Sequence, residues 1–180
     1  MKPRVMILVI FTAFVGMMLA PDTILPINYF YVLLSISLGA GSSAAFNMWF
    51  DEDIDKSMER TKTRPIPLGV ISKTEALFFG FITGIISLLI MYYVSNTLAT
   101  SLLLFTILFY VFIYTFWLKR STSLNIVIGG AAGAIPPIIG WVTVVPEINY
   151  LPVMMFLIIF FWTPPHLSLI HISEPTRPLT

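Results

Sequence analysis

The sequence predicts an all-α protein whose helices cross a membrane as a multi-span bundle, and three observations lead to this prediction. Hydrophobic residues make up 57% of the 180 residues and charged residues only 11%, and the mean hydropathy is +0.91. A soluble domain of this length could not bury so much apolar surface. The apolar residues form long runs without the alternation of barrel strands, so the spans are expected to be helices.

Six apolar runs define the expected helices. The first follows the N-terminal letters MKPR without a signal-peptide cleavage motif, so we expect it to remain as a span. The first and last runs are short for a hydrocarbon core of about 30 Å and are expected to tilt or to have indistinct ends. In order, the runs are residues 5–20, 27–50, 76–94, 98–118, 125–145 and 150–162.

The segments between the runs alternate in charge, and this alternation predicts the orientation. The turns APDTILPIN, SNT and VPEIN contain no lysine or arginine, whereas the segments at the opposite ends of the runs are basic. By the positive-inside rule, the N-terminus and the segment after the second run face the cytoplasm. The basic residues are Lys2, Arg4, Lys56, Arg60, Lys62, Arg64, Lys73, Lys119 and Arg120.

The fifth run, NIVIGGAAGAIPPIIGW, combines small residues at 129–134 with Pro136 and Pro137. Small residues permit close helix contact, and the prolines remove backbone donors, so we expect a kinked or broken helix. Packing alone would explain the small residues. The functional alternative is that they leave room for a flat macrocycle or an isoprenoid tail.

Composition also excludes several kinds of chemistry. The sequence has no cysteine, which excludes a disulfide framework, a thiol nucleophile and a cysteine-based metal site. The net charge of +1 gives no reason to expect binding to nucleic acid.

The main candidate for chemistry is the acidic end of the second run, where Asn47, Asp51 and Asp55 are spaced by four. On a helix each such step turns only about 40° beyond a full circle, so the three side chains share one stripe and Asp53 lies on the opposite side. Neighbouring carboxylates repel unless a cation lies among them. Oxygen ligands suit Mg²⁺, which often completes its coordination with substrate phosphates. The stripe is therefore interpreted as one wall of a magnesium-diphosphate site, with an ordinary solvated helix end as the alternative.

Four bases follow directly and could hold the diphosphate: Lys56, Arg60, Lys62 and Arg64. The guanidinium group of arginine matches phosphate oxygens in pairs. Pro65 favours an extended turn over helix at Arg64. Together with the apolar bundle, a cation and these bases indicate a lipid diphosphate as the substrate.

These residues resemble a known family. The stretch NMWFDEDIDKSMERTKTRPIPLG is similar to the first aspartate-rich motif, N-x-x-x-D-x-x-x-D, of the UbiA-type intramembrane prenyltransferases. Three further stretches resemble the members of that family that farnesylate protoheme IX: KPRVMILVIFTAFVGM, YTFWLKRSTSLNIVIGGAAGAIPPIIGW and FWTPPH. The resemblance runs in order from residue 2 to residue 166.

The resemblance implies a reaction. Such enzymes ionise farnesyl diphosphate with Mg²⁺ and join the farnesyl group to a vinyl group of protoheme IX, giving heme O and diphosphate. It implies that Asn47, Asp51 and Asp55 hold Mg²⁺ as catalytic residues. The implied substrates are farnesyl diphosphate and protoheme IX, within a lipid bilayer, and heme A synthase or a terminal oxidase are candidate assembly partners.

The resemblance also suggests ligands for the substrates. Arg60 and Arg64, together with Lys62, would bind the diphosphate. His166 is a candidate to contact heme or transfer a proton, although a histidine held only by structural hydrogen bonds is equally expected. Lys119 and Arg120 are interpreted as topology signals, with contact to a heme propionate as the alternative.

The resemblance implies nine helices and a second aspartate-rich motif in the later half, whereas about five to six helices are expected here. Residues 1–166 would form the N-terminal portion of the prenyltransferase domain, with a half-built metal site and little or no activity alone. The match stops at residue 167. The final segment, LSLIHISEPTRPLT, is interpreted as a non-native tail resembling translated cloning adapter.

Other functions stay open. Another prenyltransferase of this kind would act on a quinone precursor or chlorophyllide. A transporter or channel would need ionisable residues near the midplane, where this chain has almost none. A scaffold for terminal oxidase assembly would use the acidic stripe only for docking. No transit peptide precedes Lys2, so we expect the bacterial cytoplasmic membrane.

Overall fold

The computed structural model describes residues 3–59, 61–118 and 125–173, with side chains described over 5–59, 61–118 and 128–163. All regular elements in these described parts are helices, as the sequence predicts. They are α1 (Pro3–Met18), α2 (Pro26–Phe50), α3 (Glu52–Ser57), α4 (Lys73–Val94), α5 (Thr97–Leu108), the π-helix η1 (Phe109–Leu118), α7 (Asn125–Ala134), α8 (Pro136–Val144) and α9 (Tyr150–Ser173).

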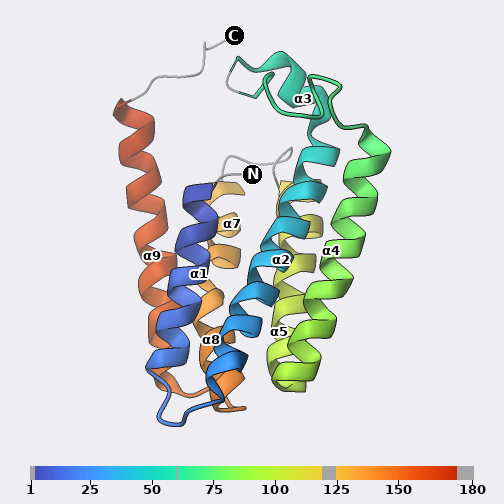
Figure 1. Cartoon of the computed structure of the whole chain (residues 1–180). Coiled ribbons are helices and arrows are strands. Elements are labelled where there is room, and N and C mark those ends of the chain that lie inside the picture. Colours follow the sequence, from blue (N-terminus) through green and yellow to red (C-terminus); the bar gives the residue numbers. More distant parts are fainter. Residues whose placement is uncertain (1–2, 60, 119–124, 174–180) are drawn as a thin grey trace.

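The helices run up and down in alternation (Figure 1). The start of α1, the short helix α3 and the start of α7 lie at one end of the bundle. The turns from α1 to α2, from α4 to α5 and from α8 to α9 lie at the other end. Among the described residues, the basic segment that runs from α3 to the start of α4 thus lies at the end opposite to the turns without lysine or arginine, as the positive-inside pattern requires.

The expected spans correspond to these helices, with informative differences. Among the described residues, Pro26–Phe50, Lys73–Val94 and Thr97–Leu118 are long and apolar enough to cross a membrane. Shorter apolar helices cover Val5–Met18, Ile128–Val144 and Tyr150–Thr163. The fourth run is α-helical only as far as Leu108 and continues as the π-helix η1. Helix α9 continues to Ser173, and the origin of the segment from residue 167 onwards stays a prediction.

The contact between α2 and α4 is built from small polar residues. The hydroxyl of Ser35 donates to the carbonyl of Ser87 over 2.8 Å, and the hydroxyl of Ser87 donates to the carbonyl of Ser35 over 2.7 Å. Further along, the hydroxyl of Ser42 donates to the carbonyl of Gly80 over 2.7 Å. Small side chains allow this backbone approach, and the hydrogen bonds fix the register of α2 against α4. They thereby fix the height at which the acidic end of α2 emerges.

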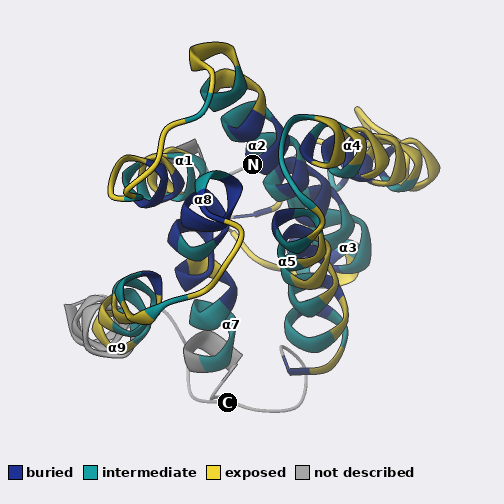
Figure 2. Cartoon of the chain, turned by 90° about the horizontal axis from the view of Figure 1, so that it is seen from below, coloured by how far each residue is buried: buried dark blue, intermediate teal, exposed yellow. Residues whose placement is uncertain are grey.

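Helices α1 and α8 also meet at backbone distance. A Cβ atom added to Gly16 would collide with the backbone of Pro137, and one added to Gly140 would collide with the backbone of Ala13. Ala13 is fully buried at this crossing. Figure 2 shows α8 almost wholly buried, whereas the outward sides of α4 and α5 are exposed.

The predicted break in the fifth run is confirmed, because α7 ends at Ala134 and α8 begins at Pro136. The glycines before the break have different surroundings. A Cβ on Gly129 would meet the ring of Tyr114, and a Cβ on Gly130 would meet Thr163. Both therefore serve close packing. A Cβ on Gly133 would meet nothing within 4 Å, so α7 leaves open space at that residue.

Candidate functional site

The acidic stripe forms as predicted, although it crosses a junction between two helices. Helix α2 ends at Phe50 and α3 begins at Glu52, so Asp51 lies between them. The amide of Asp51 donates to the carbonyl of Asn47 over 3.0 Å, and the amide of Asp55 donates to the carbonyl of Asp51 over 2.7 Å. These bonds keep the four-residue spacing of a helix, and the three residues stay on one line.

Burial separates the two sides of this segment. Asp51 is 0% exposed and Asp55 only 3%, whereas Asp53 is exposed. The prediction that Asp53 lies on the opposite side is confirmed. Buried carboxylates require a cation or several donors nearby, because removing a charge from water is costly. The burial of two carboxylates within one helical turn therefore distinguishes this end from an ordinary solvated helix end.

Arg64 reaches the lower carboxylate of the stripe. Its Nη1 atom lies 2.5 Å from Oδ2 of Asp55, whose side chain is 4% exposed, and the Arg64 side chain is 25% exposed. The guanidinium group thus covers the stripe on the side of the aqueous end. An arginine in this position is partly accessible and has further donors with which to bind an anion.

The loop that carries Arg64 is held in a defined shape. The hydroxyl of Thr61 donates to the carbonyl of Asp55 over 3.1 Å, and Thr61 is buried. The amide of Leu68 donates to the carbonyl of Arg64 over 3.0 Å. Gly69 adopts a φ of 72°, a left-handed conformation that favours glycine. At residue 64 the chain is outside any helix, as the following proline predicts.

The loop ends at a well-formed helix start. The hydroxyl of Ser72 accepts from the amide of Glu75, and the carboxylate of Glu75 accepts from the amide of Ser72. This reciprocal capping box fixes where the loop joins α4. Both ends of the segment that carries Arg64 are therefore anchored.

A second charged group links α3 to α4 outside the buried stripe. The carboxylate of Glu52 lies 2.8 Å from the ammonium group of Lys56 and 3.2 Å from that of Lys73. Lys73 also lies over the ring of Trp49, 5.8 Å from its centre. Hydrogen bonds from Lys56 and, second, from Lys73 lower the pKa of Glu52 below its ordinary value of 4.5. This group holds α3 against the start of α4.

The first member of the stripe, Asn47, contacts the π-helix. Its Nδ2 atom donates to the hydroxyl of Thr115 over 3.3 Å, and that hydroxyl donates to the carbonyl of Tyr110 over 3.0 Å. Thr115 is 0% exposed. Beyond it, the rings of Phe50 and Phe116 pack with centres 4.5 Å apart. Pi-helical turns in proteins often occur at functional sites.

Two tyrosines of η1 belong to the same region. Tyr110 and Tyr114 pack with ring centres 5.0 Å apart, and the carbonyl of Tyr110 accepts the hydrogen bond from Thr115. Neither tyrosine nor Thr115 was assigned a role from the sequence. The stretch YTFWLKR pointed to this segment only through the family resemblance, because its apolar letters give no sign of a π-helix.

The other predicted site residues are distributed differently. Lys62 pairs with Glu59 at 2.6 Å, with exposed side-chain fractions of 51% and 89%, and so lies on the exposed side of the loop that carries Arg64. Arg60, Lys119 and Arg120 lie outside the described residues. His166 lies in the backbone of α9, and its side chain also lies outside the described part.

The residues on the stripe fit one side of a Mg²⁺ site. Their oxygen donors are those that Mg²⁺ prefers, and two of the carboxylates are already buried. The searched part of the chain contains no cluster of three or more histidine, cysteine, aspartate or glutamate side chains that could hold a metal alone. A cation here would therefore need ligands from water, phosphate or other protein groups as well.

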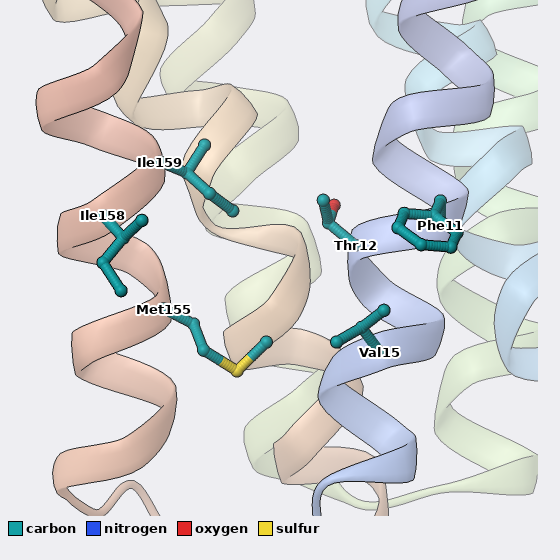
Figure 3. A pocket seen from close by; sticks show the side chains of 6 residues that line it. All are labelled: Phe11, Thr12, Val15, Met155, Ile158 and Ile159. Atoms are coloured by element: carbon teal, nitrogen blue, oxygen red, sulfur yellow. The ribbon is translucent and has the colours of Figure 1, made fainter.

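An apolar groove lies between α1 and α9, with a volume of about 210 Å³ (Figure 3). No charged side chain lines it, and none of the stripe residues contributes to it. It offers contacts for hydrocarbon and nothing for a diphosphate. Its lining residues are Phe11, Thr12, Val15, Met155, Ile158 and Ile159.

Comparison with known proteins agrees with this fold. A model of the UbiA prenyltransferase family matches residues 9–174. The protoheme IX farnesyltransferase of Granulibacter bethesdensis is 54% identical over 166 residues, covering 92% of this chain and 52% of that protein. The protein of the same name from Rickettsia prowazekii is 57% identical, covering 92% and 54%. The apo structure of a UbiA homolog from Aeropyrum pernix K1 aligns with a TM-score of 0.81 at 20% identity, covering 96% of this chain and 65% of that one.

The fold and the site define a multi-span membrane helix bundle with buried carboxylates and an arginine at one end. The chain belongs to the UbiA prenyltransferase family. It spans about half the length of the curated relatives it matches.

Proposed function

We propose that this chain supplies one wall of the active site of a protoheme IX farnesyltransferase, in which farnesyl diphosphate donates its farnesyl group to a vinyl group of protoheme IX. The observation that carries the proposal is the pair of buried carboxylates, Asp51 and Asp55, in line with Asn47 at one end of a bundle that has little other charge. The names of the curated relatives support the choice of donor and acceptor.

The proposed roles follow from the chemistry of each group. The oxygens of Asn47, Asp51 and Asp55 would hold Mg²⁺. When bound, Mg²⁺ would neutralise the charge that develops on the leaving diphosphate. Arg64 would turn further guanidinium donors toward phosphate oxygens from its place over Asp55, while Arg60 and Lys62 would supply positive charge at the mouth of the site.

The roles of the remaining parts are also proposals. The family resemblance implies that a second aspartate-rich segment would face the stripe and complete the site. His166 would contact heme or transfer a proton. The site would lie at the cytoplasmic face of a bacterial inner membrane, with the N-terminus on the same side, as the distribution of lysine and arginine favours.

Binding of farnesyl diphosphate to the chain completed with the second half of a relative, in lipid nanodiscs, tests the proposal. We expect binding that depends on Mg²⁺ and that falls by about tenfold or more in Asp51→Asn, since the variant loses a charged ligand. Asp53→Asn is the matched control, because that residue has the same chemistry on the exposed side. Equally strong binding in Asp51→Asn and Asp53→Asn, or binding that does not depend on Mg²⁺, would contradict the assignment of the site.

The acceptor requires a separate measurement. Chains completed with the second half of a relative would be incubated with farnesyl diphosphate and, in turn, protoheme IX, a quinone precursor and chlorophyllide. We expect the farnesylated product only from protoheme IX. A scaffold or transporter would form no product from any acceptor, and the function of a scaffold would survive Asp51→Asn.

A further inference from the structure

We propose that Thr115 is a positioning residue that orients the amide of Asn47, so that its carbonyl oxygen faces the cation. This inference rests on the proposed function and adds to it a residue outside the aspartate-rich segment. The two residues lie on different helices, α2 and η1, and meet where the stripe enters the bundle. The hydrogen bonds that the Thr115 hydroxyl group donates and accepts support this role.

The hydroxyl of Thr115 has a single proton, and that proton has a partner. It is donated to the carbonyl of Tyr110 over 3.0 Å. Toward Asn47, the hydroxyl oxygen of Thr115 can therefore only accept a hydrogen bond. The donor is Nδ2 of Asn47, which lies 3.3 Å away. Because Thr115 is fully buried, no bulk water competes for this hydroxyl.

The orientation of Asn47 follows from this contact. An amide carries its nitrogen and its oxygen on opposite sides, so anchoring the nitrogen to η1 turns the oxygen away from η1. The oxygen is then free to serve as a metal ligand beside the carboxylates. Rotation of the amide by half a turn would present two N–H donors to the cation, which would repel it.

The π-helix explains why this threonine can act in this way. Other threonines of the helices donate to a carbonyl three or four residues earlier, as Thr143 does to Gly140 and Thr106 does to Leu102. Thr115 instead donates to the carbonyl five residues earlier, because the turn is wider. Among the described threonines with printed bonds, it is the one that also accepts from a side chain on another helix. The unusual turn and the contact with Asn47 therefore coincide.

The test measures the binding of Mn²⁺, as a probe for Mg²⁺, by electron paramagnetic resonance, on the chain completed with the second half of a relative, in lipid nanodiscs with inorganic pyrophosphate. Thr115→Val keeps the size of the side chain and removes the hydroxyl, and we expect Mn²⁺ affinity to fall by about tenfold or more, as when a partner of a metal ligand is lost. Thr115→Ser keeps the hydroxyl and should bind close to the wild-type affinity. Thr106→Val is the matched control on the preceding helix and should also bind like the wild type.

A double variant separates positioning from general damage. Asn47→Ala should weaken binding by itself, and adding Thr115→Val to it should cause no further loss, because the threonine acts through the asparagine. An equal further loss in that background would overturn the inference, as would wild-type affinity in Thr115→Val. If Thr115→Val does not fold, Thr115→Ala takes its place with the same expectations.

The control at Asp51 distinguishes the two proposals. If Asp51→Asn loses Mn²⁺ while Thr115→Val does not, the site stands and the role of Thr115 falls. If Asp51→Asn binds Mn²⁺ as the wild type does, or the wild type binds none with pyrophosphate, the proposed site fails and the role of Thr115 fails with it.

Discussion

Removal of Arg64 should release the loop that covers the acidic stripe. The guanidinium group lies 2.5 Å from the Asp55 carboxylate, whose side chain is 4% exposed. Breaking a buried ion pair from one side typically costs about 3–5 kcal/mol, because it leaves a charge without compensation. The Arg64 side chain is itself 25% exposed, so solvent screens part of the interaction and the lower end of that range applies. For Arg64→Ala we therefore expect a loss of about 3 kcal/mol in the free energy that keeps the loop closed.

The same loop provides a matched control. Lys62 pairs with Glu59 at a similar distance, but the exposed fractions of their side chains are 51% and 89%. Exposed pairs contribute about 0–1 kcal/mol. Lys62→Ala removes the same charge from the same loop and should change the opening free energy little.

Amide hydrogen exchange over residues 58–71, measured in lipid nanodiscs, would report the difference in loop-opening free energy between Arg64→Ala and Lys62→Ala. A loss of 3 kcal/mol corresponds to exchange that is faster by about 100-fold, whereas 1 kcal/mol corresponds to only about fivefold. The amide of Leu68, bonded to the carbonyl of residue 64, is the most direct reporter. Equal exchange rates in the two variants would refute the claim that burial of Asp55 makes the Arg64 pair important.

Two further predictions concern packing and pH. Gly140→Ala places a methyl group against the backbone of Ala13, and overpacking of this kind costs about 1–3 kcal/mol, so the thermal unfolding midpoint should fall. Gly133→Ala meets open space and should not lower it, and equal midpoints would contradict the close crossing. The hydrogen bond from Lys56 lowers the pKa of Glu52 below 4.5 in the folded chain. The ionised Glu52 carboxylate therefore stabilises the position of α3 at pH values above the pKa that Glu52 has in the unfolded chain. That contribution should be lost as the pH falls below about 4.5, and Glu52→Gln should remove this pH dependence of exchange in α3.

Much of the bundle could be predicted because a chain that crosses lipid must satisfy its backbone hydrogen bonds internally, which restricts the spans to helices or closed barrels. Apolar runs must become helices, and the second run ends at Phe50, where the structure also ends α2. The pair Pro136 and Pro137 predicted the break in the fifth run, since proline has no amide to donate. The spacing of Asn47, Asp51 and Asp55 predicted one buried side and an exposed Asp53, because helical geometry alone fixes that alternation.

The parts that could not be predicted depend on contacts between distant segments. A π-helix at 109–118 differs from an α-helix by the choice of carbonyl, and the letters FYVFIYTFWL favour neither. The roles of Arg64 and Lys62 could not be separated by sequence, because both are bases in one loop and only the folded loop buries one of their partners. The contact between Asn47 and Thr115 joins two helices whose relative rotation the sequence does not reveal.

The close crossing of α1 and α8 has a consequence for biosynthesis. Helix α1 leaves the ribosome before α8, yet the backbone that packs against Gly16 of α1 belongs to Pro137, which is made much later. At about 5–20 residues per second, the wait is on the order of 10 s. During that time the narrow face of α1 must be covered by lipid or by the insertion machinery. The insertion of α1 into the membrane therefore precedes the packing of its small-residue face against α8.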